Sequence, residues 1–137
     1  MSSAIDQLAV YLHLANAAGK KLRMPDRDRL LVIAAVRASE MRLEAIAHYC
    51  RRLILKNNPG HMLRKWDSVK EAVEDPDFLV FLKQVLRRYP IEKAETMLAE
   101  LGIERGNERA AYYTDQEYAA ALLGVDQQWL NEQFGNG

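Results

Sequence analysis

The chain has 137 residues, of which 49 % are hydrophobic and 28 % are charged. This is the composition of one ordinary globular domain, and a chain of this length can bury a core without a disulfide or a structural metal. Its 19 basic and 19 acidic residues cancel, which argues against a general polyanion-binding protein. The longest apolar run, Leu30 to Val36, is far shorter than the roughly 20 residues of a membrane span. With one cysteine and no basic signal-type segment at its start, we expect a cytoplasmic protein without a membrane partner.

The first half of the chain predicts long helices. Apolar residues recur at helical spacing over 3–18, and Gly19 is a natural stop for this helix. A second helix opens at 24–26 and either continues to Asn57 or bends near 38–39. Its first half is apolar on all sides, which is typical of a central, buried helix. We expect one stripe of this helix to be buried: Val32, Val36, Leu43, Cys50 and Ile54.

The second half of the chain is marked by helix caps. Ser68 and Thr114 each stand three residues before a glutamate, which is the pattern of a capping box, while Asp75 and Asp126 are typical N-cap residues. The predicted helices span 76–89, 90–101, 114–124 and 126–134, with a turn at 62–66 and a loop or short helix at 104–113. In the helix after Asp75, the residues expected to face inward are Phe78, Leu79, Leu82, Val85 and Leu86. The sequence therefore predicts a single all-α domain over 1–137, a compact bundle of six to eight helices with a long central second helix.

Charge is unevenly spread along the chain. Residues 1–60 hold ten basic and five acidic side chains, whereas residues 110–137 hold four acidic and no basic ones. The basic residues form two clusters in sequence: Lys20, Lys21, Arg23, Arg27 and Arg29 at one helix junction, and Arg51, Arg52, Lys56, Arg64 and Lys65 further on. Either these are solvated faces beside the acidic tail, which we favour, or they form an exposed patch for an acidic partner or a phosphate backbone. Tyr112 and Tyr113 adjoin a polar loop, and one ring is expected to be exposed as part of an interaction surface.

Glu40, Glu44 and His48 are spaced by four, so they would line one side of the predicted second helix. Such a column could bind a metal or perform acid–base chemistry. The favoured interpretation is a solvated face of helical ion pairs, in which Arg37 pairs with Glu40 and Glu44 with His48. The sequence has no phosphate-binding glycine loop and no nucleophile elbow. We therefore expect no catalytic residue, no metal and no cofactor.

The segment 118–130 resembles the helix-turn-helix of DNA-binding regulators. Small residues precede Leu-Leu-Gly-Val, in which Gly124 would adopt the left-handed turn, and Leu130 would be the apolar anchor of the second helix. The resemblance covers only 114–134 and implies that Gln127, Gln128 and Asn131 face DNA. No lysine or arginine follows Arg109, and phosphate contacts supply much of the affinity of DNA binding. We therefore expect a helix-turn-helix-like corner that does not bind DNA.

The sequence is compatible with three functions, given in decreasing order of preference. The first is a non-enzymatic helical module that binds a protein partner or its own copy. The second is a small nucleic-acid-binding regulator that uses the basic N-terminal half. The third is an enzyme or metal site on the column of Glu40, Glu44 and His48.

Overall fold

The computed structural model of the chain describes residues 3–104 and 106–135. Within these ranges the backbone forms eight α-helices and two short 3-10 helices, and no strand. In chain order they are α1 (Ala4–Lys20), α2 (Met24–Glu40), α3 (Glu44–Asn57), η1 (Met62–Lys65), α4 (Val69–Ala72), α5 (Pro76–Arg88), α6 (Ile91–Glu100), η2 (Glu108–Ala111), α7 (Asp115–Leu122) and α8 (Gln127–Phe134). The expected all-α class is confirmed. Among the described residues, no helix is both long and apolar enough to cross a lipid bilayer.

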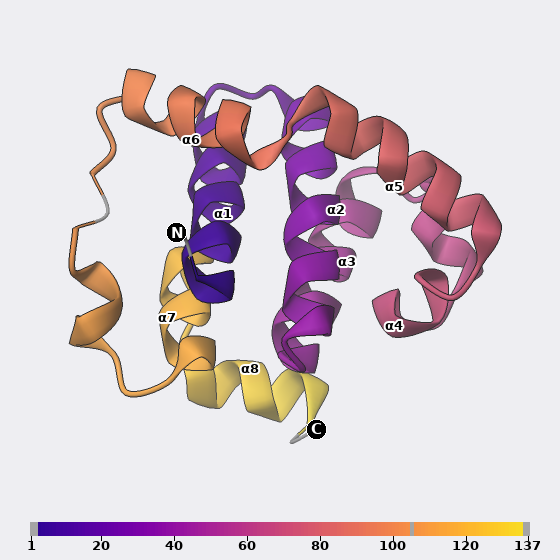
Figure 1. Cartoon of the computed structure of the whole chain (residues 1–137). Coiled ribbons are helices and arrows are strands. Elements are labelled where there is room, and N and C mark those ends of the chain that lie inside the picture. Colours follow the sequence, from indigo (N-terminus) through magenta and orange to yellow (C-terminus); the bar gives the residue numbers. More distant parts are fainter. Residues whose placement is uncertain (1–2, 105, 136–137) are drawn as a thin grey trace.

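Helix α2 forms the centre of the molecule. It packs against α1 on one side and α3 on the other (Figure 1). Every residue from Leu30 to Val36 is buried, so this stretch has no solvent-facing side. A helix that is hydrophobic all round is stable only when other elements cover it. The expected central position of this helix is therefore confirmed.

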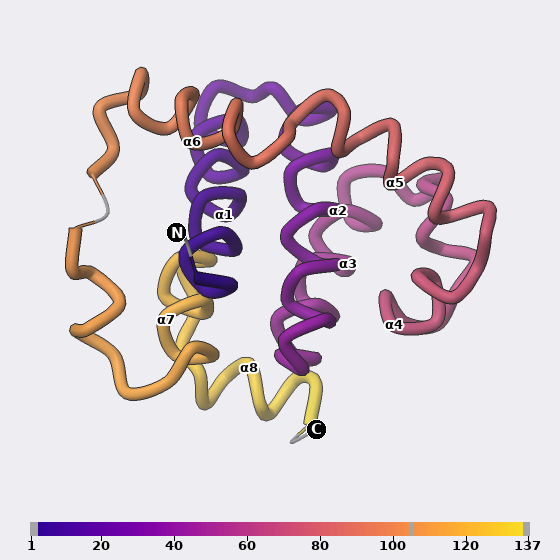
Figure 2. The backbone as a smooth tube through the Cα atoms, in the orientation of Figure 1, coloured from indigo at the N-terminus to yellow at the C-terminus, as the bar shows by residue number. Residues whose placement is uncertain are grey.

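The remaining helices cover the two ends of the α1–α2–α3 layer. Helices α4 and α5 pack on α2, α6 packs on α1, and α8 packs on α3 and α7. Figure 1 shows α5 and α6 across one end of the layer and α7 and α8 at the other. The long connection from α6 to α7 returns along α1 (Figure 2), where His13 Nε2 lies 2.8 Å from Glu108 Oε1. One hydrophobic cluster joins all these elements.

The predicted caps are present. The hydroxyl oxygens of Ser68 and Thr114 each accept a hydrogen bond from the backbone N–H three residues later, at 3.1 and 3.0 Å. Asp75 and Asp126 accept from the N–H two residues later, at 2.8 and 2.6 Å. Each cap satisfies a helix N–H that has no partner within its own helix. The helix starts in the second half of the chain are therefore where the sequence predicts them.

One of the two alternatives was a second helix that continues to Asn57, and the structure does not show it. The second helix ends at Glu40, and a turn over 41–43 separates it from α3. In this turn Arg42 adopts φ 62°, and the N–H of Leu43 donates to the carbonyl of Ala38 at 2.8 Å. This is a Schellman closure, in which a left-handed residue ends a helix. Leu43, expected to be buried, is only half-buried at the start of α3.

The turn between α1 and α2 closes in the same way. Leu22 adopts φ 59°, and the N–H of Arg23 donates to the carbonyl of Ala18 at 2.9 Å. The prediction that Gly19 stops this helix is wrong, because Gly19 lies inside α1. A Cβ at Gly19 would lie 3.3 Å from Cδ of Arg27, so this glycine makes room for a side chain of α2. The left-handed position is filled by a leucine instead of a glycine.

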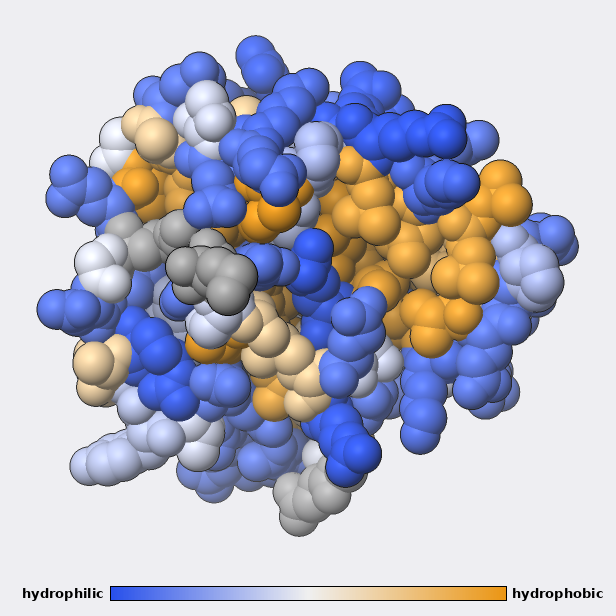
Figure 3. Space-filling view, in the orientation of Figure 1, coloured by the Kyte–Doolittle hydropathy of each residue, from blue (hydrophilic) through white to orange (hydrophobic). Residues whose placement is uncertain are grey.

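Helix α5 buries a narrower stripe than the sequence predicts. Phe78, Leu82 and Val85 are buried, but Leu79 is 44 % exposed and Val80 is 62 % exposed. Residues 78, 82 and 85 share one face of the helix, and residue 79 is turned about 100° away from residue 78. Figure 3 shows hydrophobic side chains gathered on the surface between α2 and α5. The expectation that Leu79 faces inward is therefore wrong.

We expect Val36→Asp to lower the free energy of unfolding by about 3 kcal/mol or more, because it places an unpaired carboxylate in the core. Val36 is 6 % exposed. Denaturant unfolding followed by circular dichroism measures the change. The control is Val80→Asp on the exposed side of α5, which should change the free energy of unfolding little. Equal stability of the Val36→Asp variant and the parent would show that α2 is not the centre of the core.

We expect Leu22→Gly to raise the free energy of unfolding by about 0.5–1 kcal/mol, because glycine has no Cβ to strain a left-handed backbone. The control is Leu22→Ala, which keeps the backbone strain and removes most of the apolar side chain. If Leu22→Ala stabilised the chain as much as Leu22→Gly does, exposure of the leucine side chain would be the cause and the backbone argument would fail.

Gly124 has φ 75° and open space around it. Gly124→Ala should therefore lower the free energy of unfolding by roughly 1 kcal/mol from backbone strain alone.

Candidate functional site

The turn between α1 and α2 presents three cations around an exposed leucine. Lys20, Lys21 and Arg23 are exposed, and Leu22 between them is 82 % exposed. Among the described residues, none of these three cations forms an ion pair. We call residues 20–23 the cationic turn. It lies at the same end of the molecule as α6 (Figure 1). It contains three of the five residues of the first basic cluster predicted from the sequence.

An apolar cavity of about 180 Å³ opens beside the cationic turn. Lys21 and Arg23 line its rim, together with Glu100 from α6. The other lining residues come from three helices and include Leu14, Ala17, Ala18, Leu30, Met97 and Leu101. Leu14 and Leu30 belong to the buried core, whereas Leu101 is 41 % exposed. The cavity is therefore an opening in the core that is surrounded by charge.

The polar wall of this cavity is held by fixed hydrogen bonds. The hydroxyl of Tyr89 donates to Asp26 at 3.0 Å, and Arg29 pairs with the same carboxylate at 3.2 Å. The hydroxyl of Tyr11 donates to the carbonyl of Tyr89 at 2.8 Å. Burial, and then the bond to Asp26, raise the pKa of Tyr89, so its hydroxyl remains protonated at neutral pH. Two carboxylates therefore line the cavity: Asp26, which is paired with Arg29, and Glu100 on α6.

A second hollow of about 290 Å³ continues along α1. It shares Ala17, Lys21 and Leu101 with the first and adds Lys20 and Ile103. The shared residues join the two hollows into one surface along α1 and α6. This surface, with the cationic turn, is the candidate site.

Arg27, a further member of the first basic cluster, does not join the site. Its guanidinium donates to the carbonyl of Leu53 at 2.9 Å and pairs with Asp28 at 3.3 Å. Asp28, which is 6 % exposed, also accepts from Asn57 at 2.9 Å. These contacts tie the start of α2 to α3. The expectation that Arg27 is part of an exposed patch is therefore wrong.

Some residues of the second basic cluster are also bonded within the protein, and others are exposed. Arg51 donates to the carbonyl of Trp66 at 2.8 Å, and the guanidinium of Arg52 lies 4.3 Å from the ring centre of Phe134. Arg64 and Lys65 are exposed on η1. The two arginines of α3 thus make contacts within the protein, whereas Lys56, Arg64 and Lys65, the other members of this cluster, are exposed.

The polar column does not form on one helix. Glu40 ends α2, whereas Glu44 and His48 belong to α3 beyond the turn. His48 stacks on Phe134 with 6.0 Å between ring centres, and Arg37 donates to Gln7 at 2.7 Å. The single-helix geometry expected for Glu40, Glu44 and His48 is wrong, because the left-handed turn at 41–43 interrupts it. Among the described residues, no three metal-ligating side chains cluster.

The helix-turn-helix-like corner has the predicted turn but uses its polar groups internally. Gly124 has φ 75°, and Leu130 is fully buried. Gln127 accepts from Thr114 at 3.1 Å, and Asn131 accepts from Gln116 at 2.8 Å. Gln128 donates to Glu132 at 3.3 Å. All three amides that the resemblance places toward DNA therefore bind neighbouring side chains.

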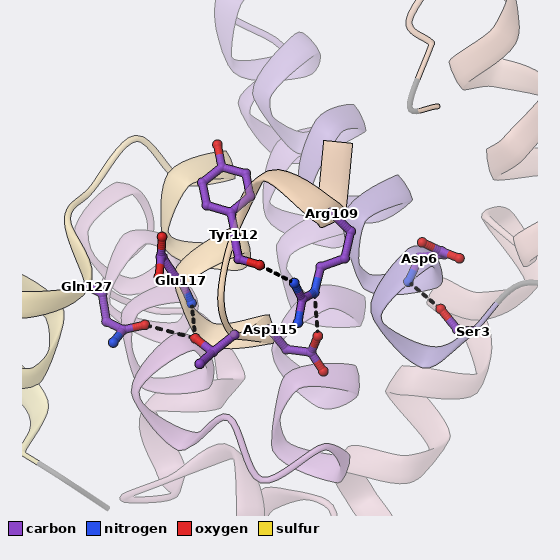
Figure 4. A network of polar contacts seen from close by, with 8 residues as sticks. Ser3, Asp6, Arg109, Tyr112, Asp115, Glu117 and Gln127 are labelled. Carbon is purple, nitrogen blue, oxygen red and sulfur yellow. Dashed lines mark hydrogen bonds and ion pairs between the residues drawn. The ribbon is translucent and has the colours of Figure 1, made fainter. Parts of the chain in front are cut away.

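The approach to this corner contains the last cation of the chain. The guanidinium of Arg109 donates to Asp115 at 2.8 Å and to the carbonyl of Tyr112 at 2.7 Å (Figure 4). Tyr112 is half-buried against Tyr118, whereas Tyr113 is 94 % exposed. The prediction that one of the two rings faces outward is confirmed. Arg109 is therefore bonded to groups within its own segment.

Comparison of the chain with family models, with curated proteins and with solved structures finds no match. The site is therefore interpreted from its own residues. Sequence patterns located the cations of the turn, but the cavity was missed because its walls come from three helices. The sequence signal for the exposed leucine was an apolar residue between basic ones at a helix junction.

We expect His61 to make the stability depend on pH below about 6.5, the ordinary pKa of histidine. Its Nδ1 accepts from the N–H of Leu63 at 3.1 Å, and burial lowers its pKa despite the opposing charge of Asp28. As the pH falls from 6.5, the unfolded chain binds a proton that the folded chain resists. Folding stability should therefore fall, until the pH passes the lowered pKa.

The matched variant is His61→Asn, which keeps a capping oxygen and does not titrate. Denaturant unfolding between about pH 5 and pH 7.5 compares its slope with that of the parent. The variant should lose less stability on acidification. Identical slopes would show that His61 titrates normally in the folded state.

Proposed function

We propose that this chain is a non-enzymatic protein-interaction module that binds an acidic segment of a partner protein at the cationic turn. The observation that carries the proposal is the group of three cations around an exposed leucine, beside an apolar cavity; none of these cations pairs with a described acidic residue. Complementary charge steers and orients partners, and burial of apolar anchors contributes most of the binding energy. This surface offers both kinds of contact within one site.

The backbone of Leu22 supports the same proposal. A left-handed leucine is strained, and such strain in proteins clusters at functional sites. Leu22 is also 82 % exposed, so its side chain makes little contribution to the core. A contact with a partner gives a physical reason for an apolar residue at this position.

Two observations favour a protein partner over nucleic acid. The cavity and the exposed Leu22 and Leu101 offer apolar contacts, which a phosphate backbone does not use. In the C-terminal corner, Gln127 and Asn131 are bonded to neighbouring side chains. A nucleic-acid-binding regulator is therefore the alternative that the binding experiment has to separate.

We expect the double variant Lys21→Glu/Arg23→Glu to bind an acidic peptide at least about tenfold more weakly than the parent, because two attractions become repulsions. The probe is a short fluorescent peptide of aspartate and glutamate with one central phenylalanine. Fluorescence anisotropy at about 50 mM salt, where screening is weak, measures the affinity.

The matched control is Arg64→Glu/Lys65→Glu, which changes the net charge equally on an exposed part of η1. It should bind the peptide nearly as well as the parent. Equal losses in both variants would mean that net charge alone attracts the peptide, and the proposed site would be wrong. Tighter binding of duplex DNA than of the peptide, sensitive to Lys21 and Arg23, would replace the proposal with the nucleic-acid alternative.

A further inference from the structure

We infer that the cavity beside Lys21 receives one large apolar side chain, of phenylalanine or leucine size, from the acidic segment of the partner; this inference rests on the proposed function. The volume of the cavity is about 180 Å³. A protein cavity of about 150 Å³ lined by apolar side chains is enough to bind benzene. The space therefore suits one aromatic ring or one branched aliphatic side chain.

The walls of the cavity suit such an anchor. Leu14 and Leu30 form rigid parts of the core, each 2 % exposed, while Met97 contributes a flexible thioether. Methionine adapts its shape to a ring and makes favourable contacts with it. An aromatic side chain would therefore fill the cavity without displacing a helix.

The charges at the rim define what should flank the anchor. Lys21 and Arg23 lie on the side of the cationic turn, whereas Glu100 lies on the side of α6. Acidic residues of the partner are attracted to the first side and repelled from the second. The preferred ligand is therefore an apolar residue with acidic neighbours on one side and a neutral or basic residue on the other.

The surroundings of the cavity favour a peptide over a small free ligand. Leu22 is 82 % exposed and does not line the cavity, so a molecule that fills only the cavity would leave it in water. The second hollow adjoins the first through Ala17, Lys21 and Leu101. A peptide that continues along α1 would cover these residues as well as the cavity.

The test compares two peptides that carry acidic residues on one side of the central residue and neutral residues on the other. They differ only in the central residue, phenylalanine or alanine, and their binding is measured by fluorescence anisotropy. The parent should bind the phenylalanine peptide at least about tenfold more tightly, as expected for burial of one large apolar side chain. In Ala17→Leu a leucine occupies the cavity from within, so this preference should fall close to one while salt-dependent binding of both peptides remains. Ala121→Leu, at an exposed position of α7, is the matched control and should keep the preference.

A second variant serves if Ala17→Leu fails to fold. Met97→Ala enlarges the cavity, so the preferred anchor should change from phenylalanine to tryptophan. Equal binding of the phenylalanine and alanine peptides to the parent, with both lost in Lys21→Glu/Arg23→Glu, would overturn the anchor and leave the proposed function in place. A stable dimer that dissociates when Leu22 is replaced by glycine, and that excludes both peptides, would also overturn it, because a second copy would then occupy the cavity.

Discussion

Burial of α2 on all sides is the constraint on which the rest of the fold depends. A helix with no solvent-facing side over Leu30–Val36 needs neighbours along its whole circumference. The preceding and following segments are the nearest ones available, so the chain reverses direction at both ends of α2. Each reversal is a left-handed closure, at Leu22 and at Arg42. The cationic turn is therefore placed at the end of the bundle by the same constraint that forms the core.

The features that the sequence predicts correctly are those set by local interactions. Ser68, Thr114 and Asp126 cap helices through bonds to an N–H two or three residues away, and such bonds are encoded within one short segment. The break at 41–43 was not predicted as a turn because no glycine or proline marks it. Gly19 was predicted to end a helix because the sequence alone does not show which side chain packs against this glycine. Its lack of a side chain serves packing against Arg27, which lies eight positions further along the chain.

The candidate site was predictable in its charges but not in its shape. Lys20, Lys21 and Arg23 are adjacent in sequence and remain exposed, whereas Arg27 turns inward because acceptors from α3 lie within reach. That distinction depends on how α2 and α3 pack, and no local pattern contains it. The cavity has the same origin, since α1, α2 and α6 each contribute part of its wall. The site is therefore a product of tertiary packing acting on a basic segment.

Among the described residues, four helices end in a left-handed closure. Comparing the residues at these four positions shows which of them folding explains. Gly102 and Gly124 show that glycine meets the backbone requirement after α6 and α7. Arg42 shows that a long polar residue is also accommodated, because its side chain can remain solvated. Leu22 has neither advantage, since it combines a strained backbone with an apolar side chain that is 82 % exposed. Folding alone gives no reason for leucine at this position, whereas an apolar contact made outside the chain does. The cations on both sides of Leu22 would then hold the acidic partner segment against that contact.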